Sequence, residues 1–130
     1  MGIELSIKPG CNRPFWVQAD QEKIKRVLIN LISNAIRYGK EDGHVWIGFY
    51  NIDDHILTEI SDDGIGIDTP HIDKVFSRFY RIDKSRKNVK RSSGLGLSIV
   101  KHILEAHEQS IHVRSTIDVG TTFGFTLKKN

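Results

Sequence analysis

The amino-acid sequence predicts an α+β fold, a two-layer sandwich in which helices pack on one face of a mixed, mostly antiparallel sheet. Three observations support this class. One long segment carries apolar residues at helical spacing, two pairs of β-rich segments are joined by short turns, and 130 residues are enough for one compact domain. We therefore treat residues 1–130 as a single domain.

Six β-rich segments and three helical segments follow one another along the chain. The strands are expected at residues 3–8, 15–17, 44–50, 55–60, 111–117 and 122–127. The long helix is expected to start at the N-cap Asp20 and to end near Tyr38, before Gly39. The remaining expected segments are a short helix from Thr69-Pro70, a loop over 83–93 and a helix from Gly94 to about His107.

Composition excludes several classes of protein. Lys and Arg total 19 against 16 Asp and Glu, and a net charge of +3 is too small to indicate a nucleic-acid-binding protein. The single cysteine, Cys11, cannot form an internal disulfide. No apolar run approaches the roughly 20 residues that cross a bilayer. Met1-Gly2 with Ser6 fits the permissive myristoylation pattern, but a fragment that begins just before a strand is the preferred interpretation.

The long helix carries polar residues at the spacing of one turn. Asn30 and Asn34 stack on one face, with Arg37 and Tyr38 beside them. Asparagine is a mediocre helix former, so two of them in mid-helix suggest a function, and an amide oxygen is a suitable ligand for Mg²⁺. Taken alone, however, a solvated polar face of an amphipathic helix is the simpler explanation.

Two glycine-containing segments have the chemistry of a nucleotide site. Residues 62–67 follow a strand directly, and there Asp62 is able to accept a hydrogen bond from the amine of adenine. An ordinary Asp/Gly turn is the alternative. Gly94 and Gly96 begin a helix, where free backbone N–H groups favour a polyphosphate. Neither segment has the fingerprint of a Rossmann fold or a Walker A loop.

A third segment mixes aromatic and basic residues. Residues 75–81 interleave Phe76, Phe79 and Tyr80 with Arg78 and Arg81. The guanidinium groups are suited to bind phosphate, whereas a hydrophobic helix end explains the aromatic residues equally well. The six histidines lack the spacing of a helical zinc site, so we interpret them as structural or solvated.

Taken in order, these segments resemble the sequence boxes of the catalytic and ATP-binding domain of sensor histidine kinases. That domain belongs to a superfamily that also includes gyrase, the Hsp90 chaperones and the MutL repair proteins. The N, G1, F and G2 boxes are matched by residues 30–38, 62–67, 76–81 and 93–100, and residues 120–123 resemble the turn before the last strand. The match covers essentially the whole chain and implies a Bergerat-type fold in which ATP lies beside a mobile lid at 83–93.

The resemblance also implies a role for each matched residue. Asn34 would hold Mg²⁺, with Asn30 on the phosphate side and Arg37 and Arg81 contributing charge to the transfer. Contacts with the nucleotide are implied for Asn34, Tyr38, Asp62, Gly64, Gly66, Gly94, Leu95, Gly96 and Thr122. One departure is the pair Ser92 and Ser93, which stands where the family often has further glycines, so the hinge of the lid is expected to be stiffer. A second is Arg37, at a position where Lys is also common; either supplies charge, but Arg is able to bind bidentately.

The expected reaction is phosphoryl transfer to a histidine. Hydrolytic relatives carry a glutamate at the position of Asn30, and an amide cannot act as a general base. The accepting histidine is expected on a separate dimerisation domain, with a response regulator downstream and no nucleic-acid partner. The isolated domain is expected to be a monomer, the full protein a cytoplasmic or membrane-anchored homodimer. A serine kinase of the anti-sigma-factor type and a nucleotide-sensing module without catalysis remain alternatives.

Overall fold

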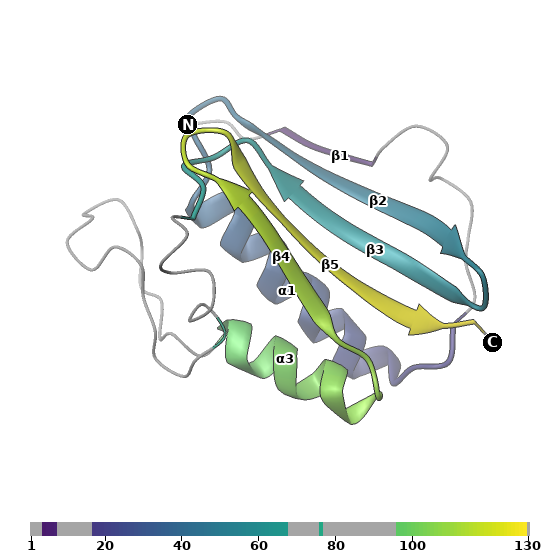
Figure 1. Cartoon of the computed structure of the whole chain (residues 1–130). Helices are drawn as coiled ribbons and strands as arrows, with labels where there is room; N and C mark the ends of the chain where they lie inside the picture. Colours follow the sequence, from purple (N-terminus) through teal and green to yellow (C-terminus); the bar gives the residue numbers. More distant parts are fainter. Residues whose placement is uncertain (1–3, 8–16, 68–75, 77–95, 130) are drawn as a thin grey trace.

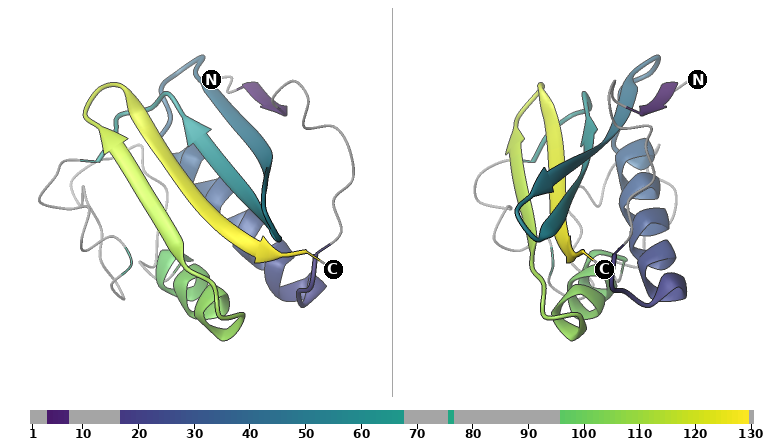
Figure 2. Two further views of the ribbon diagram at one scale, coloured as in Figure 1. Left: turned by 45° about the vertical axis from the view of Figure 1, so that its right-hand side comes forward. Right: turned by 90° about the vertical axis from the view of Figure 1, so that its right-hand side faces the viewer.

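In the part of the chain that the structure describes, a five-stranded sheet packs against two helices (Figure 1). The computed structural model describes residues 4–7, 17–67, 76 and 96–129. The strands are β1 (Glu4–Ile7), β2 (His44–Ile52), β3 (His55–Asp62), β4 (Ile111–Thr116) and β5 (Gly120–Lys128), and the helices are α1 (Gln21–Arg37) and α3 (Gly96–Ala106). The turned views of Figure 2 show both helices on the same side of the sheet. The predicted α+β two-layer sandwich is therefore confirmed.

The sheet is mixed, with the strand order β1-β2-β3-β5-β4. β1 runs parallel to β2, and every other neighbouring pair is antiparallel. The turn between β2 and β3 is shorter than the predicted turn of residues 51–54, because β2 continues through Ile52 and Asp53 adopts a φ of 53°. Since β3 pairs with β5, the end of β3 lies between strands that are distant in the sequence.

Helix α1 begins where the sequence predicts. Asp20 is its N-cap, and the Oδ1 atom accepts a hydrogen bond from a backbone N–H of the first turn at 3.1 Å. Val27, Leu31 and Ala35 recur every four residues and are buried against the sheet. The predicted helix over residues 20–38 is thus confirmed to within one residue at each end.

His107 ties the end of α3 to the start of α1. Its Nδ1–H donates to the carbonyl of Ile103 at 2.8 Å, and its Nε2 accepts from the backbone N–H of Asp20 at 3.0 Å. The neutral ring therefore caps two helices at once. This finding agrees with the prediction that the histidines are structural or solvated.

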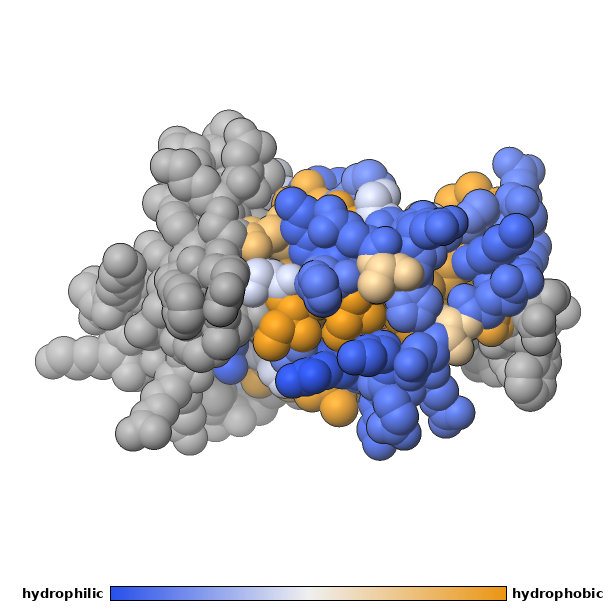
Figure 3. Space-filling model, turned by 90° about the horizontal axis from the view of Figure 1, so that it is seen from below, coloured by the Kyte–Doolittle hydropathy of each residue, from blue (hydrophilic) through white to orange (hydrophobic). Residues whose placement is uncertain are grey.

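A single apolar core fills the space between the sheet and the helices. Its buried members are Val27, Leu31, Ala35, Val45, Ile60, Ile67, Val100, Ile103, Leu104, Phe123, Phe125 and Leu127. Burying side chains of this size contributes roughly 1.5–3 kcal/mol each. Figure 3 shows further apolar side chains at the surface between polar bands, and Ile29 and Ile36 of α1 are 54% and 42% exposed. Neither described helix is long and apolar enough to cross a membrane.

Several predicted segments lie wholly or partly outside the described residues. They are the short strand at 15–17, the short helix from Thr69, the loop at 83–93 and the first two residues of the helix predicted from Gly94. Val17, the last residue of the predicted short strand, forms an isolated antiparallel bridge with Lys129.

Candidate functional site

Three polar side chains form one row across the end of the sheet. Asp62 of β3 pairs with Thr121 of β5, and Thr121 pairs with Ser115 of β4. Because side chains alternate along a strand, these three residues share the sheet face of two buried residues, Ile60 and Phe123, which lie two positions from Asp62 and from Thr121. We call Asp62, Thr121 and Ser115 the polar row. It lies on the helix side of the sheet, next to the core.

Asp62 is a partly buried carboxylate within this row. Its Oδ1 atom accepts a hydrogen bond from the backbone N–H of Gly64 at 2.9 Å. Burial raises the pKa of Asp62 to about 6, although hydrogen bonds from the backbone N–H groups of Gly64 and Thr121 oppose this rise. The carboxyl group is therefore mainly ionised at pH 7, and it is able to accept a hydrogen bond from an amine.

Asp63, the next residue, has an opposite environment. Its Oδ1 atom accepts from the backbone N–H of His44 at 2.7 Å, and its Oδ2 atom lies 3.3 Å from Nδ1 of the same ring. Burial alone would raise the pKa of Asp63, but the hydrogen bonds from His44 outweigh it and lower the pKa. The other ring nitrogen of His44 lies 3.4 Å from Glu4 of β1. Both carboxylate oxygens of Asp63 are therefore occupied by His44, whereas the carboxylate of Asp62 faces the helix side of the sheet.

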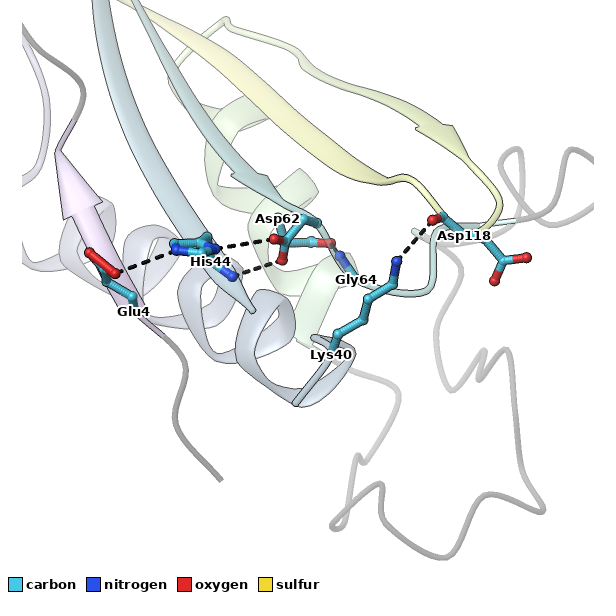
Figure 4. A network of polar contacts seen from close by, with 7 residues as sticks. Glu4, Lys40, His44, Asp62, Gly64 and Asp118 are labelled. Carbon is cyan, nitrogen blue, oxygen red and sulfur yellow. Dashed lines mark hydrogen bonds and ion pairs between the residues drawn. The ribbon is translucent and has the colours of Figure 1, made fainter. Parts of the chain in front are cut away.

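The loop after Asp62 is held between two other segments. The carbonyl of Tyr38, at the end of α1, accepts from the N–H of Ile65 at 3.2 Å. The carbonyl of Ile65 accepts from the N–H of Asp118, in the β4–β5 turn, at 2.8 Å. Lys40 also donates to the carbonyl of Asp118 at 2.9 Å (Figure 4). These bonds fix the polar row relative to α1.

Gly64 and Gly66 permit close contacts within the protein. A Cβ atom on Gly64 would lie 2.3 Å from the carbonyl oxygen of Tyr38. Gly66 has a φ of 76°, and a Cβ atom there would lie 2.2 Å from the carbonyl oxygen of Thr116. For both glycines, the family resemblance implies contacts with the nucleotide. In the structure, the spaces that their side chains would fill are occupied by neighbouring backbone.

One face of α1 connects the polar row with the start of α3. At one end of this face, a Cβ atom on Gly96 would lie 3.8 Å from Oδ1 of Asn30. At the other end, Tyr38 contacts the loop after Asp62. Asn34 lies one turn from each and is partly buried, so the predicted pair of asparagines spans the distance between the two regions.

The other predicted residues are placed as follows. Arg37 occupies the last turn of α1 and is partly buried. Phe76 packs edge to face on Phe123, with ring centroids 6.0 Å apart, which supports a packing role for this aromatic residue. Arg81, Gly94, Leu95 and the predicted lid lie outside the described residues. Among the residues that the structure does describe, no group of three or more His, Cys, Asp or Glu side chains is placed to hold a metal ion.

The structure places Thr122, predicted to contact the nucleotide, on the other face of the sheet. Thr122 pairs with Ser61, and their hydroxyl oxygens lie 2.9 Å apart on the sheet face opposite Asp62. Thr121 lies beside Asp62 instead. The alternation of buried Phe123 and Phe125 sets this parity, and it is the signal in the sequence that would have identified Thr121.

Ser115 was also missed by the sequence analysis. Its hydroxyl contacts Ile67, whose position in the chain is 48 residues away. The contact depends on the strand order, in which β5 lies between β3 and β4. This order brings Ser115 of β4 near the loop that follows β3. Nothing in the local sequence around Ser115 indicates that pairing.

Comparisons with known proteins identify the family. Residues 19–130 match the family model described as histidine kinase-, DNA gyrase B- and HSP90-like ATPase. The chain is 43% identical over 118 residues to the sensor histidine kinase WalK of Bacillus subtilis (strain 168), covering 89% of this chain and 19% of WalK. It is 40% identical over 119 residues to the sensor protein SrrB of Staphylococcus aureus (strain MRSA252), covering 92% of this chain and 20% of SrrB. The chain thus spans about a fifth of the length of these relatives.

Solved structures give the same assignment. A mycobacterial sensor histidine kinase, MprB, is 28% identical and superposes with a TM-score of 0.82, covering 98% of this chain and 83% of that one. The nucleotide-free catalytic domain of histidine kinase ThkA is 29% identical, with a TM-score of 0.81 and coverages of 98% and 80%. With the family model matched across most of its length, the chain belongs to the family of histidine kinase-, DNA gyrase B- and HSP90-like ATPases.

Proposed function

We propose that this domain binds ATP with Mg²⁺ and supplies the γ-phosphoryl group to a histidine on a separate dimerisation domain. One observation carries the proposal. A single polar face of α1 runs from Gly96, at the start of α3, to the loop beside Asp62. Membership of the ATPase family supports this interpretation.

The polar row is the proposed site for the adenine base. The ionised Asp62 carboxylate would accept a hydrogen bond from the adenine amine, and Thr121 lies directly across from it. Core residues such as Ile67 and Phe123 border this row and would supply an apolar wall for the ring. Tyr38 lies between the base and the phosphates in this arrangement.

The asparagine face is the proposed site for the phosphates and the metal. A bound Mg²⁺ ion would neutralise phosphate charge, and the residue that would hold it is Asn34, through its amide oxygen. Asn30 lies beside the start of α3, where backbone N–H groups and the helix dipole favour an anion. Arg37, Arg81, Gly94 and Leu95 keep their predicted roles in this proposal.

Transfer is favoured over hydrolysis by the residue at position 30. An amide cannot take a proton from water at neutral pH, so Asn30 would help to position the phosphates rather than activate a water molecule. Phosphoryl transfer depends mainly on positioning and on neutralising charge, which the proposed site supplies. Because the related kinase ThkA has been solved in complex with the response regulator TrrA, we extend the proposal to a response regulator that receives the phosphoryl group. We place the domain in the cytoplasmic part of such a sensor, which would act as a homodimer.

Nucleotide binding is the first test. Titration calorimetry should give a dissociation constant for Mg²⁺·ATP that rises at least tenfold, about 1.4 kcal/mol, in Asn34→Ala and in Asp62→Asn. The loss in Asn34→Ala should largely disappear when EDTA replaces Mg²⁺, whereas the loss in Asp62→Asn should persist. Ser61→Ala, on the opposite sheet face, is the matched control and should bind like the wild type. Unchanged affinity in both site variants would refute the proposed site.

Phosphoryl transfer is the second test. The domain should be incubated with γ-labelled ATP and a dimerisation domain taken from the same full-length kinase. A phosphohistidine loses its label in acid, whereas a phosphoserine keeps it, so acid treatment separates histidine transfer from the serine-kinase alternative. Binding without any transfer would instead support the nucleotide-sensing alternative.

A further inference from the structure

The hydroxyl group of Ser115 makes three polar contacts at the end of the polar row. It lies 2.6 Å from the backbone nitrogen of Ile67, 2.9 Å from the carbonyl oxygen of Gly120 and 2.7 Å from Oγ1 of Thr121. Ser115 thus joins the loop after Asp62 to the start of β5. The group is partly buried at the edge of the core.

These contacts determine which group is the donor in each of the three hydrogen bonds of the Ser115 hydroxyl. A serine hydroxyl has one proton to donate and two lone pairs that accept. The carbonyl of Gly120 accepts only, so Ser115 donates its proton there. The N–H of Ile67 donates only, so it occupies one lone pair. The remaining lone pair faces Thr121, which must therefore donate its hydroxyl proton to Ser115.

We propose that Ser115 is a positioning residue that sets base specificity by holding the hydroxyl proton of Thr121 away from the nucleotide. This inference rests on the proposed ATP-binding function. With its proton bonded to Ser115, Oγ1 of Thr121 presents lone pairs only. Thr121 pairs directly with Asp62, whose ionised carboxylate also accepts only. The two side chains together form a wall of hydrogen-bond acceptors.

A wall of acceptors distinguishes purines by the group at position 6. Adenine carries an amine there, which donates, whereas hypoxanthine carries a carbonyl, which accepts and is repelled. Without the hydroxyl of Ser115, the proton of Thr121 is free to rotate and to donate to such a carbonyl. Specificity then relaxes although Asp62 is unchanged.

The experiment compares ATP with inosine triphosphate. Dissociation constants of both nucleotides with Mg²⁺ are measured by titration calorimetry for the wild type, Ser115→Ala and Ser115→Thr. The preference for ATP should fall about three- to tenfold in Ser115→Ala, the scale of one hydrogen bond. Ser115→Thr keeps a hydroxyl and should retain most of the preference. Each preference is a ratio measured on one protein, so a partial loss of folded protein cancels.

Two further variants separate positioning from a structural role. Ser61→Ala removes the hydrogen bond between the hydroxyl groups of Ser61 and Thr122, whose oxygens lie 2.9 Å apart on the opposite sheet face. This variant should leave the preference for ATP unchanged. In a Thr121→Val background, where no hydroxyl proton remains to be directed, Ser115→Ala should cause no further change. An unchanged preference in Ser115→Ala, or an equal fall in Ser61→Ala, overturns the inference. Failure of the wild type to bind either nucleotide refutes the proposed function itself, which is a different result.

Discussion

Two adjacent aspartates at the end of β3 show how strand parity determines the chemistry of a residue. Asp62 points to the helix side, where burial raises its pKa to about 6. Asp63 points away, where hydrogen bonds from His44 overcome burial and lower its pKa. The sequence predicts Asp62 as the adenine-binding carboxylate because it directly follows a strand and begins the segment that resembles the G1 box. The opposite shifts of the two pKa values required the structure.

Replacing Asp62 should stabilise the free domain. A carboxyl group whose pKa is raised by folding binds protons more tightly in the folded state, so its contribution to stability falls as pH rises from 3.8 to about 6 and stays lost above that. With allowance for solvent screening, Asp62→Asn should raise the free energy of unfolding at pH 7 by about 1–2 kcal/mol. Urea denaturation at pH 4 and pH 7 measures this, and the gain should be much smaller at pH 4.

The neighbouring substitution is the control for that prediction. Asp63 has a lowered pKa, so its stabilising effect is present above pH 3.8 and disappears as pH falls through its folded value. Asp63→Asn should therefore destabilise the domain at pH 7. If both variants changed stability in the same direction, the assigned environments would be wrong.

Nucleotide affinity should decrease below about pH 6. The ionised form of Asp62 accepts a hydrogen bond from the adenine amine more strongly than the neutral acid does, and burial raises the pKa of this carboxyl to about 6. From pH 7 to pH 5 the dissociation constant of ATP should increase, by up to about tenfold, for this reason. The phosphates of ATP also titrate in this range, so the pH dependence must be compared with that of Asp62→Asn. Equal pH dependence in both proteins would contradict the prediction.

At the scale of elements, the close approach of β5 to β3 depends on one glycine. Gly120 has a φ of 145°, and a Cβ atom there would lie 1.9 Å from the carbonyl oxygen of Asp62. Gly124, further along the same strand, has room for a Cβ atom at ordinary contact distance. The nearest atoms to a Cβ atom at Gly124 are 3.6 Å away, in Glu59 and Leu57. The two glycines therefore have different functions in one strand.

Substituting alanine at these two positions should have opposite effects. Gly120→Ala forces the strands apart at the polar row and should cost at least about 2 kcal/mol of unfolding free energy. Gly124→Ala restricts the unfolded chain without a clash and should be neutral or stabilising by up to about 1 kcal/mol. Urea denaturation followed by circular dichroism measures both. Similar losses in the two variants would show that the contact at Gly120 has no special importance.

At the scale of the whole molecule, local patterns predicted the elements, and non-local pairing determined the site. The alternation in β3 and the helical spacing of Val27, Leu31 and Ala35 are local signals, so those elements were predicted within one or two residues. The row that joins Asp62 to Ser115 depends on the pairing of β3 with β5 and of β5 with β4. Pairing between distant segments leaves no periodic signal in a single sequence. The face on which Thr122 lies is different in this respect, because the parity of β5 is readable from the alternation of Phe123 and Phe125.

The same architecture explains why ligand binding should stabilise the entire domain. The proposed nucleotide contacts α1 at Asn34 and the sheet at Asp62, so its binding energy is lost if either layer unfolds. Ligand at 100 times its dissociation constant should add about 2.7 kcal/mol to the free energy of unfolding. For a domain of this size, that corresponds to a rise of roughly 5–10 °C in melting temperature.

Thermal unfolding with and without Mg²⁺·ATP tests this coupling against a variant that behaves in the opposite way. Asp62→Asn should melt above the wild type when no nucleotide is present, because an uncharged group replaces a buried carboxylate. With saturating Mg²⁺·ATP the order should reverse, since only the wild type retains the charged acceptor for the adenine amine. A crossing of this kind cannot arise from stability alone. If Asp62→Asn gained as much from the nucleotide as the wild type, the base would have to bind away from the polar row.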